Sequence, residues 1–313
     1  MCSERARLPP GINARPLVAA DIPAALRLSE EAGWNQGRGR LAAVLAAGQG
    51  IGATDGDMLV ATALTLPYGD PGSGSASPFG WISMVLVTAA WRRRGLATWL
   101  LNRCIRVFRA DGRTAVLDAT PAGREVYLRL GFRDGPRLMR FEGGRPAVTG
   151  TAPAGVEIRS FHPEDMATAA ELDVRVFGGN RRAVLADLAR SQFSAAWVAW
   201  QDGRLATQIS PLVATAPALA IALFARASTG ATQAHLFVDA FADQSDFTAH
   251  LTALGFRPQR PFTRMSLGGA APGRHDLLFA AAGPNWAEPR AHRHFGFAKS
   301  ARGSAGYCAL VRE

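Results

Sequence analysis

The sequence predicts a mixed α/β fold in two tandem domains, each a twisted mixed sheet flanked by helices. Strand-like and helix-like apolar patterns alternate along both halves of the 313-residue chain, as they do in α/β proteins. In the first half, apolar strands at 81–87 and 114–119 enclose an amphipathic helix, which predicts a parallel pair joined by a crossover. Between the halves, the stretch 143–155 is rich in glycine, proline and small residues and predicts a linker.

The apolar spacing predicts each element of the first half in turn. Apolar residues three or four apart indicate helices, and Asp21 is a candidate N-cap for the first of them. Short apolar runs indicate strands, and the Asp-Gly-Asp at 55–57 is a turn signal between two of them. In chain order we expect a strand at 13–18, helices at 21–33 and 38–48, strands at 51–55, 58–66 and 81–87, a helix from Leu96 to Phe108, a strand at 114–119, a helix at 123–130 and a final strand after Gly131.

The two halves resemble each other, which indicates an internal duplication. Arg15 and Asp21 near the start of the first half match Arg159 and Asp165 in the second. The step LGFRD at 130–134 returns later in the chain, in the same order, as LGFRP at 254–258. We therefore expect an N-terminal tail at 1–12, a first domain at 13–142, the linker at 143–155, a second domain at 156–286 and a C-terminal tail at 287–313.

The composition favours a soluble globular protein over a nucleic-acid-binding or membrane protein. Hydrophobic residues make up 48% of the chain, which is enough to bury two cores. The formal net charge is +10, but Lys299 is the only lysine and the arginines are scattered, so we expect no nucleic-acid partner. The apolar run near 212–225 is too short to span a bilayer, and the N-terminus lacks the apolar core of a secretory signal. We expect no membrane association and a cytoplasmic location.

Neither the cysteines nor the histidines form a metal-ligand pattern. Cys2, Cys104 and Cys308 lie far apart in the sequence, and Cys104 falls on the apolar face of a predicted helix, where we expect core packing. His292 and His294 form an HxH pair in the tail with no further ligand type close by. We therefore expect no metal cofactor.

A short basic stretch at 92–98 has the composition of an anion site. Arg92, Arg93 and Arg94 lead into Gly95, and a predicted helix starts directly after it. The first amides of a helix have no intrahelical partner, and the positive end of the helix dipole favours an anion there. Close backbone approach at the glycine, together with the arginine side chains, fits a pyrophosphate. A solvated basic helix start is the alternative; the chain has no P-loop and no GxGxxG after its first strand.

The stretch RRRGLA at 92–97 resembles the R/Q-x-x-G-x-G/A signature of the GNAT N-acetyltransferases. The strand SMVLV before it and the segment VYLRLGF after it lie where that family has them. Over roughly residues 13–285 the chain is similar to bacterial GNAT proteins that carry a second, divergent GNAT-like domain, more specifically in the first half than in the second. The resemblance implies acetyl-CoA, or another acyl-CoA, as the donor. It also implies that the pyrophosphate is held at Arg92, Arg93, Arg94, Gly95, Leu96, Ala97 and Thr98, and that the backbone of Val85, Leu86 and Val87 pairs with the pantetheine arm.

Acyl transfer from a thioester to an amine needs a neutral amine, a stabilised oxyanion and a proton for the leaving thiolate. The resemblance implies that Tyr127 protonates the CoA sulfur. It also implies that a strand amide near Leu86 or Val87 contacts the oxyanion. The alternative for Tyr127 is a ring packed on the core with its hydroxyl in water.

The general base and the acceptor pocket are left open by the sequence. Trp34 and Tyr68 are candidates for the pocket wall, and each could equally belong to the core. A water chain could serve as the base, and the carboxylates that could do so are Glu30, Glu31, Asp118 and Glu125, each of which could instead be a surface or capping group.

The second half lacks the residues that carry this chemistry. Its corresponding region, 209–224, keeps a strand and a helix but has no arginine and glycine step. Leu251 stands at the position that matches Tyr127. We expect a degenerate copy that shapes the acceptor pocket, stabilises the first half or binds a separate ligand.

The sequence therefore predicts an acyl-CoA-dependent N-acetyltransferase that transfers an acetyl group to a primary amine by direct attack, with one working site in the first half. The expected acceptor is a small molecule rather than a protein N-terminus or lysine, and a homodimer is one option for assembly. The alternative from another class is a non-catalytic sensor of CoA or a metabolite. Tyr127 together with an intact anion cradle favours the enzyme.

Overall fold

The computed structural model describes residues 7–34, 37–69, 78–147, 152–182, 185–186, 197–201, 204–208, 212–229 and 235–281. Within these ranges the first half alternates strands and helices, and every element predicted for it is present. The elements are β1 (Ile12–Pro16), the 3₁₀ turn η1 (Ala19–Asp21), α1 (Ile22–Glu31), α2 (Arg38–Ala47), β2 (Gln49–Asp55), β3 (Met58–Tyr68), β4 (Phe79–Val87), the 3₁₀ turn η2 (Ala89–Trp91), α3 (Leu96–Ala110), β5 (Thr114–Ala119), α4 (Pro121–Arg129) and β6 (Arg133–Gly144).

The second half repeats the same order of elements. The counterparts of β1 to β6 and their helices are β7 (Val156–Ser160), η3 (Pro163–Asp165), α5 (Met166–Phe177), β8 (Trp197–Gln201), β9 (Arg204–Gln208), β10 (Leu212–Ala214), α7 (Pro217–Thr229), β11 (His235–Phe241), α8 (Ser245–Ala253) and β12 (Arg257–Leu267). Two further elements follow: a 3₁₀ turn, η4 (His275–Leu277), and a short strand, β13 (Leu278–Ala280). Nothing in the described part of the first half corresponds to these two.

The matched arginine and aspartate residues have the same geometry in both halves, which supports the predicted duplication. Arg15 binds the Asp21 carboxylate through two hydrogen bonds of 2.7 Å, and Arg159 binds Asp165 in the same way. The Asp21 carboxylate also accepts the Val18 amide at 2.9 Å and makes no hydrogen bond to the amides of α1. Asp21 thus precedes the helix, as predicted, but it anchors the strand-to-helix turn instead of capping the helix.

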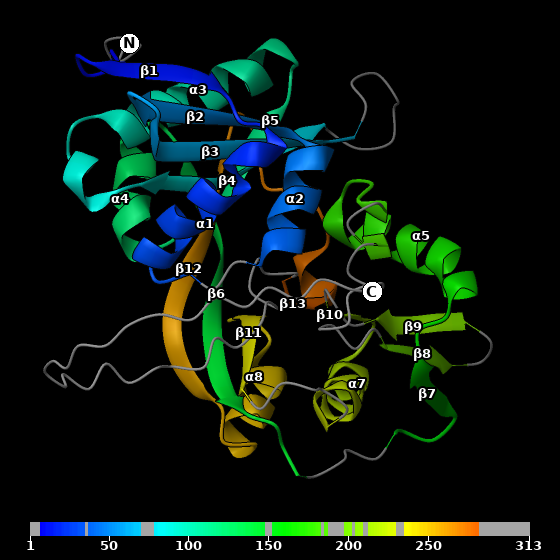
Figure 1. Cartoon of the computed structure of the whole chain (residues 1–313). Helices are drawn as coiled ribbons and strands as arrows, with labels where there is room; N and C mark the ends of the chain where they lie inside the picture. The colour runs from blue at the N-terminus through cyan, green and yellow to red at the C-terminus, as the bar shows by residue number, and fades with distance from the viewer. Residues whose placement is uncertain are drawn as a thin grey trace, which may run out of the picture.

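The two halves form one sheet because the equivalent strands β6 and β12 each pair with a strand of the other half. The thirteen strands described lie in the order β1-β2-β3-β4-β5-β12-β6-β11-β13-β10-β9-β8-β7 (Figure 1). Strand β12 of the second half pairs with β5 of the first, and β6 of the first half pairs with β11 of the second. At the centre β12 and β6 pair with each other in antiparallel register. The predicted mixed α/β class is confirmed, and its two sheets are continuous.

Two equivalent ion pairs lie across the exchanged strands. Arg264 on β12 binds Asp118 on β5 through hydrogen bonds of 2.9 and 3.1 Å, and Arg140 on β6 binds Asp239 on β11 through two of 2.7 Å. The two arginines occupy the same position relative to the repeated Leu-Gly-Phe step. Arg140 is 2% exposed and Asp239 7%. A buried bidentate pair of this kind specifies which strand lies beside which, since a slipped register would leave a buried charge without a partner.

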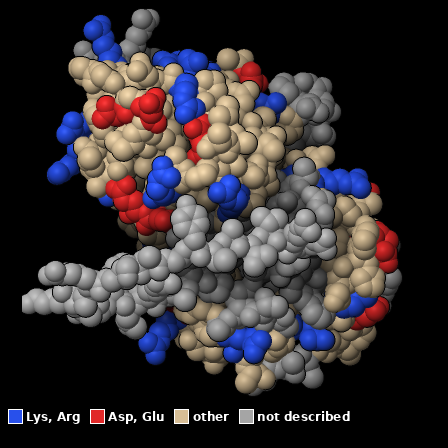
Figure 2. All heavy atoms as spheres, viewed as in Figure 1, with Lys and Arg blue, Asp and Glu red and all other residues tan. Residues whose placement is uncertain are grey.

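Helices cover both faces of the sheet. In the first half, α1 and α2 pack on one face around Leu41 and Met84, whereas α3 and α4 pack on the other around Leu100 and Phe108. Equivalent apolar clusters lie under α7 and α8 and under α5 in the second half. On the face shown in Figure 2, basic and acidic side chains are interspersed over both halves. None of the helices described is long and apolar enough to cross a bilayer.

Because each half completes the sheet of the other, we predict that a fragment of residues 1–147 does not fold by itself. Without β12, strands β5 and β6 would expose unpaired edges and the apolar side chains beneath them. Urea unfolding followed by circular dichroism should show no cooperative transition for the fragment, whereas the full chain should show one. A stable monomeric fragment with a sharp transition would contradict the reciprocal exchange.

We predict that Arg140→Met lowers the free energy of unfolding by about 3–5 kcal/mol, because it leaves the Asp239 carboxylate buried without its partner. The double variant Arg140→Met, Asp239→Leu should recover much of the loss. The matched control is Arg274→Met, whose pair with Asp276 is exposed at 62% and 59% and should leave the urea midpoint unchanged. Equal midpoints for Arg140→Met and the wild-type protein would show that the buried pair does not hold the exchanged strands.

Candidate active site

Strands β4 and β5 run parallel and then part. Their ladder consists of three residue pairs, from Phe79–Thr114 to Trp81–Val116, which confirms the predicted parallel arrangement. From Ile82 to Val87, the edge of β4 that faces β5 has no strand opposite it among the described residues. Backbone N–H and C=O groups on such an edge are open to a ligand that pairs as an extra strand.

Two local features of β4 shape the gap that opens between β4 and β5 beyond Trp81. At Gly80, a Cβ atom would lie 2.1 Å from the ring of Phe108, so glycine allows α3 to close against the point where the strands meet. Further along, Met84 has φ +52° and the register with β3 shifts by one residue, which makes a β-bulge. The Met84 carbonyl accepts the Thr62 hydroxyl at 2.8 Å. Bulges re-aim the residues beside them, and this one directly precedes 85–87.

The connection from β4 to α3 forms an anion cradle. Arg93 has φ +61° and Gly95 φ +84°, an alternation that turns successive backbone amides toward one side. In the described part of the chain, no acceptor binds the amides of 93–98, and the first helical bond is that from the Trp99 amide to the Gly95 carbonyl at 2.9 Å. No atom lies within 4 Å of the place that a Cβ would take at Gly95. These amides can therefore bind an anion as bulky as a diphosphate.

The three arginines have different partners. Arg92 donates from Nε to the Val87 carbonyl at 3.0 Å and lies 3.7 Å from the Glu31 carboxylate, so it ties the loop to the end of β4. The Arg94 guanidinium stacks over the Trp91 ring, with its central carbon 4.7 Å from the ring centroid. Arg93 is exposed, and no carboxylate of the described residues pairs with it. Its charge is thus the most available of the three to a bound anion.

Glu31 anchors the cradle and is poorly suited to act as a base. Its carboxylate accepts the Ala89 amide and the Thr88 hydroxyl, the latter at 2.7 Å. These hydrogen bonds, with the Arg92 charge, hold the pKa of Glu31 below its usual range. Glu31 therefore fixes the turn η2 against α1.

The other candidate carboxylates have surface or structural positions. Asp118 is bound to Arg264, Glu125 is exposed beside Arg124 at 3.7 Å, and Glu30 is exposed on α1. Within the described ranges no three His, Cys, Asp or Glu side chains gather as metal ligands would. The tail at 287–313, with His292 and His294, lies outside those ranges.

Tyr127 lies on α4 and faces the core formed under α3 and α4. Its ring is half-buried and lies 5.9 Å from the Phe132 ring between centroids. Burial, with a smaller contribution from Cys104, raises the pKa of Tyr127 to about 12. The hydroxyl is therefore protonated near neutral pH and available as a proton donor. Cys104 itself is 2% exposed, which confirms the predicted core position, and burial raises its pKa to about 12.

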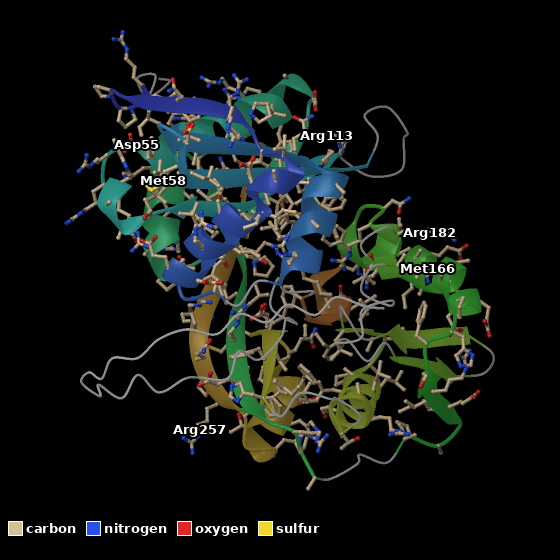
Figure 3. All side chains as sticks on the ribbon, in the orientation of Figure 1. Asp55, Met58, Arg113, Met166, Arg182 and Arg257 are labelled. Carbon is tan, nitrogen blue, oxygen red and sulfur yellow. The ribbon has the colours of Figure 1, made fainter. Side chains whose placement is uncertain are left out.

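Trp34 and Tyr68 lie at two different places around the first half. Trp34 packs against the α1 cluster, and its amide donates to the Ser29 carbonyl at 2.8 Å. The Tyr68 ring lies 5.0 Å from Phe177 between centroids, in the packing between the halves. Arg113, labelled in Figure 3, donates to the Tyr68 carbonyl at 2.8 Å and so ties the end of β3 to the start of β5.

The second half contributes side chains that the sequence did not point to. The Phe177 ring at the end of α5 lies 5.9 Å from the Trp81 ring between centroids. The Arg264 guanidinium carbon lies 4.8 Å from the centroid of the Trp81 ring. Close by in sequence to Trp81, Ser83 on β4 of the first half has a buried hydroxyl with no hydrogen-bond partner among the described residues. His275 shares the neighbourhood of Arg264. Nothing in the sequence signals these contacts, because residues far apart along the chain form them through the strand exchange.

In the second half, the corresponding gap is filled by the chain itself. Strand β13 lies between β10 and β11 and pairs with both. Only two residues, Thr215 and Ala216, connect β10 to α7, and the amides of Leu219 and Ala220 donate to the Ala216 carbonyl at 3.2 Å. The second half thus offers neither an open strand edge nor a loop of unpaired amides at this place.

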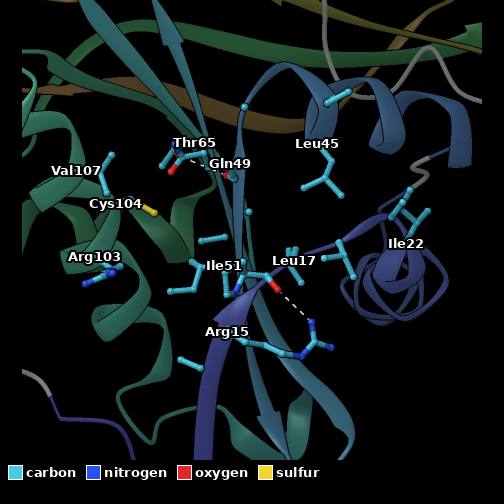
Figure 4. A pocket seen from close by; sticks show the side chains of 18 of the residues that line it. Arg15, Leu17, Ile22, Leu45, Gln49, Ile51, Thr65, Arg103, Cys104 and Val107 are labelled. Carbon is cyan, nitrogen blue, oxygen red and sulfur yellow. Dashed lines mark hydrogen bonds between the residues drawn. The ribbon is translucent and has the colours of Figure 1, made fainter.

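A cavity of about 950 Å³ lies elsewhere in the first half, around the end of β1 (Figure 4). Its lining is mainly apolar and comes from β1, β2, α2 and α3, with Leu17, Ile51 and Val107 among its residues. It does not include the amides of 93–98. The cradle is therefore defined by its unpaired backbone groups.

Comparison with known proteins gives the same family for both halves. The sequence model described as the Acetyltransferase (GNAT) family matches residues 22–132, and the model described as an Acetyltransferase (GNAT) domain matches residues 169–280. The chain is also 25% identical over 246 residues to the uncharacterized N-acetyltransferase YitH of Bacillus subtilis. The aligned region covers 74% of this chain and 83% of YitH.

Solved structures share the fold. A Pyrococcus horikoshii structure provisionally assigned as an acetyltransferase has a TM-score of 0.69 at 20% identity, covering 90% of this chain and 98% of that one. A tandem GNAT protein from the clavulanic acid biosynthesis pathway has a TM-score of 0.58 at 16% identity, covering 83% and 100%. The two family matches, in the order in which the structure repeats its elements, place the chain in the GNAT acetyltransferase family as a protein with two GNAT domains in tandem.

Proposed function

We propose that the protein is an N-acetyltransferase that moves an acetyl group from acetyl-CoA to the primary amine of a small molecule, with its chemistry in the first half. The observation that carries this proposal is the row of unpaired amides at 93–98 beside the open edge of β4. A diphosphate needs such amides, and a pantetheine arm needs such an edge. The GNAT family match to residues 22–132 includes both features.

The residues of the first half divide the work of binding. The amides of 93–98 hold the pyrophosphate, helped by the free guanidinium of Arg93. Arg92 and Arg94 shape the cradle through their contacts with Val87 and Trp91. The backbone at 85–87 pairs with the pantetheine arm and so directs the thioester toward the point where β4 and β5 meet.

The same residues position the chemistry. When bound, acetyl-CoA supplies an activated carbonyl group. A β4 amide at Leu86 or Val87, next to the Met84 bulge, donates to the carbonyl oxygen as negative charge develops there. Tyr127 donates its proton to the departing sulfur, and its raised pKa keeps that proton in place until then.

A small acceptor fits this arrangement better than a protein chain. Side chains of the second half, Phe177 and Arg264, pack on Trp81 where β4 and β5 meet. Their contacts with Trp81 narrow the space on that side of the junction, which supports a small acceptor. A cytoplasmic location and assembly as a homodimer stay predictions.

We predict that Gly95→Val weakens acetyl-CoA binding at least tenfold. A valine side chain at φ +84° strains the loop, and its methyl groups would enter the space that the diphosphate needs. Titration calorimetry should give a micromolar Kd for the wild-type protein, about −8 kcal/mol. The matched control is Gly112→Val at the other end of α3, where φ is +62° and the space is also open. If Gly95→Val binds acetyl-CoA as tightly as Gly112→Val and the wild-type protein do, the pyrophosphate lies elsewhere.

We predict that Tyr127→Phe lowers kcat about 100-fold while the Kd of acetyl-CoA stays within twofold, because the hydroxyl acts only on the departing sulfur. The measurement is thiol release during acetylation of a panel of small amines. Since the pKa of Tyr127 is about 12, its loss should leave the pH dependence between 6 and 9 unchanged. An unaltered kcat would rule out Tyr127 as the acid, and a wild-type protein that releases no thiol with any amine would refute the proposed function.

A further inference from the structure

Among the described residues of the first half, no carboxylate is placed to act as the general base, whereas the second half places a histidine on the ring cluster that Arg264 links to Trp81. Glu31 and Asp118 are already bound, to the η2 turn and to Arg264. The strand exchange brings Arg264 onto the Trp81 ring. On the turn η4, His275 stacks on the Phe241 ring that the Arg264 guanidinium also contacts.

Hydrogen bonds of the surrounding backbone and one ring contact define the position of His275. Its backbone is held by Gln244, whose side-chain amide donates to the Asp276 carbonyl at 2.9 Å, and by the Arg274 amide, which donates to the Val176 carbonyl at 2.7 Å. The imidazole stacks on Phe241 with 6.0 Å between centroids and 27° between planes. The Arg264 guanidinium carbon lies 4.9 Å from the centroid of that same Phe241 ring.

His275 is half-buried, but both of its ring nitrogens are shielded from solvent and lack the well-formed hydrogen bonds of a structural histidine within the described residues. Neither Nδ1 nor Nε2 has a partner in the described residues that meets hydrogen-bond geometry. The Ala271 carbonyl approaches the ring and favours an N–H there, which would leave the other nitrogen with its lone pair. A leucine or phenylalanine would pack on Phe241 without leaving buried polar atoms unpaired. At least one buried ring nitrogen therefore keeps a lone pair without a hydrogen-bond partner among the described residues, which points to a role beyond packing.

The charged groups around His275 favour its neutral form. Burial, together with the positive charge of Arg264 on β12, lowers the pKa of His275 below its usual value. Asp118 on β5 and Asp276 on η4 act in the opposite direction, but each carboxylate is bound bidentately, to Arg264 and to Arg274. A neutral imidazole at pH 7 can accept a proton.

We propose that His275, supplied by the second half, is the general base for the acceptor amine in the first half's site. This assignment rests on the proposed function. His275 takes one proton from the acceptor ammonium and passes it to solvent. The amine lone pair then forms the C–N bond, and the C–S bond breaks with its electron pair going to sulfur. Tyr127 gives its proton to that sulfur, which forms the CoA thiol. The new amide nitrogen still carries one proton too many, and this proton returns to the Tyr127 oxygen through water. The products are an N-acetyl amine and CoA thiol.

The test compares His275→Asn with His250→Asn. His250 is a matched control because it also has a buried, unpaired ring nitrogen and a pKa lowered by burial, but it lies on α8 over the second half's core. We expect His275→Asn to lower kcat about 100-fold with an unchanged Kd for acetyl-CoA, and His250→Asn to leave both unchanged. In the wild-type protein, kcat/KM should fall as the pH drops through the lowered pKa of His275, and this acid limb should be absent in His275→Asn.

A second variant separates proton transfer from packing. In His275→Ala, added imidazole should restore part of the lost kcat, which loss of structure alone would not allow. Retention of wild-type kcat and of the acid limb in His275→Asn would overturn the assignment while leaving the N-acetyltransferase proposal intact. If the asparagine variant fails to fold, absence of imidazole rescue in folded His275→Ala overturns it equally. A wild-type protein that binds acetyl-CoA but releases no thiol with any amine would overturn both proposals.

Discussion

The reciprocal exchange of β6 and β12 is the constraint on which the rest of the structure depends. Each strand completes the sheet of the other half, and the pairs Arg264–Asp118 and Arg140–Asp239 fix which strands are neighbours. A buried arginine and aspartate pair contributes less to stability than to register, because an incorrect alignment leaves both charges unpaired. The exchange makes the two halves a single folding unit. It also carries side chains of the second half to the place where β4 and β5 part.

The two halves show two solutions to one physical problem. Parallel strands that part leave backbone polar groups along the gap, and such groups need partners. In the second half the chain supplies the partner itself, since β13 pairs with both β10 and β11. In the first half no described strand enters the gap, and the neighbouring loop presents unpaired amides. The gap in the second half is therefore closed by β13. The gap in the first half is open to a ligand that has a strand-like arm to pair with β4 and a diphosphate group to bind the loop amides.

Charge at the cradle is divided between structure and binding. Three consecutive arginines look equivalent along the sequence, but Arg92 ties the loop to β4 and Arg94 stacks on Trp91. Glu31 holds the same turn from the other side through the Ala89 amide and the Thr88 hydroxyl. The left-handed conformations at Arg93 and Gly95 are stabilised by these surrounding contacts, and they aim the amides in one direction. The backbone conformation that the proposed anion site requires is thus already present without a ligand.

By itself, the sequence determined the elements, the duplication and the family resemblance. Apolar spacing and turn residues act locally, so the helices and strands of the first half lie where they were predicted. The RRRGLA step and the matched pairs Arg15–Asp21 and Arg159–Asp165 are also local signals. Tertiary structure alone decided the strand exchange, the position of β13 in the second gap, the contacts of Arg264 with Trp81 and Asp118, and the stacking of His275 on Phe241. These contacts join residues that are distant along the chain, as the separation of 146 positions between Arg264 and Asp118 illustrates. No periodicity along a single chain records which distant strand will lie beside which.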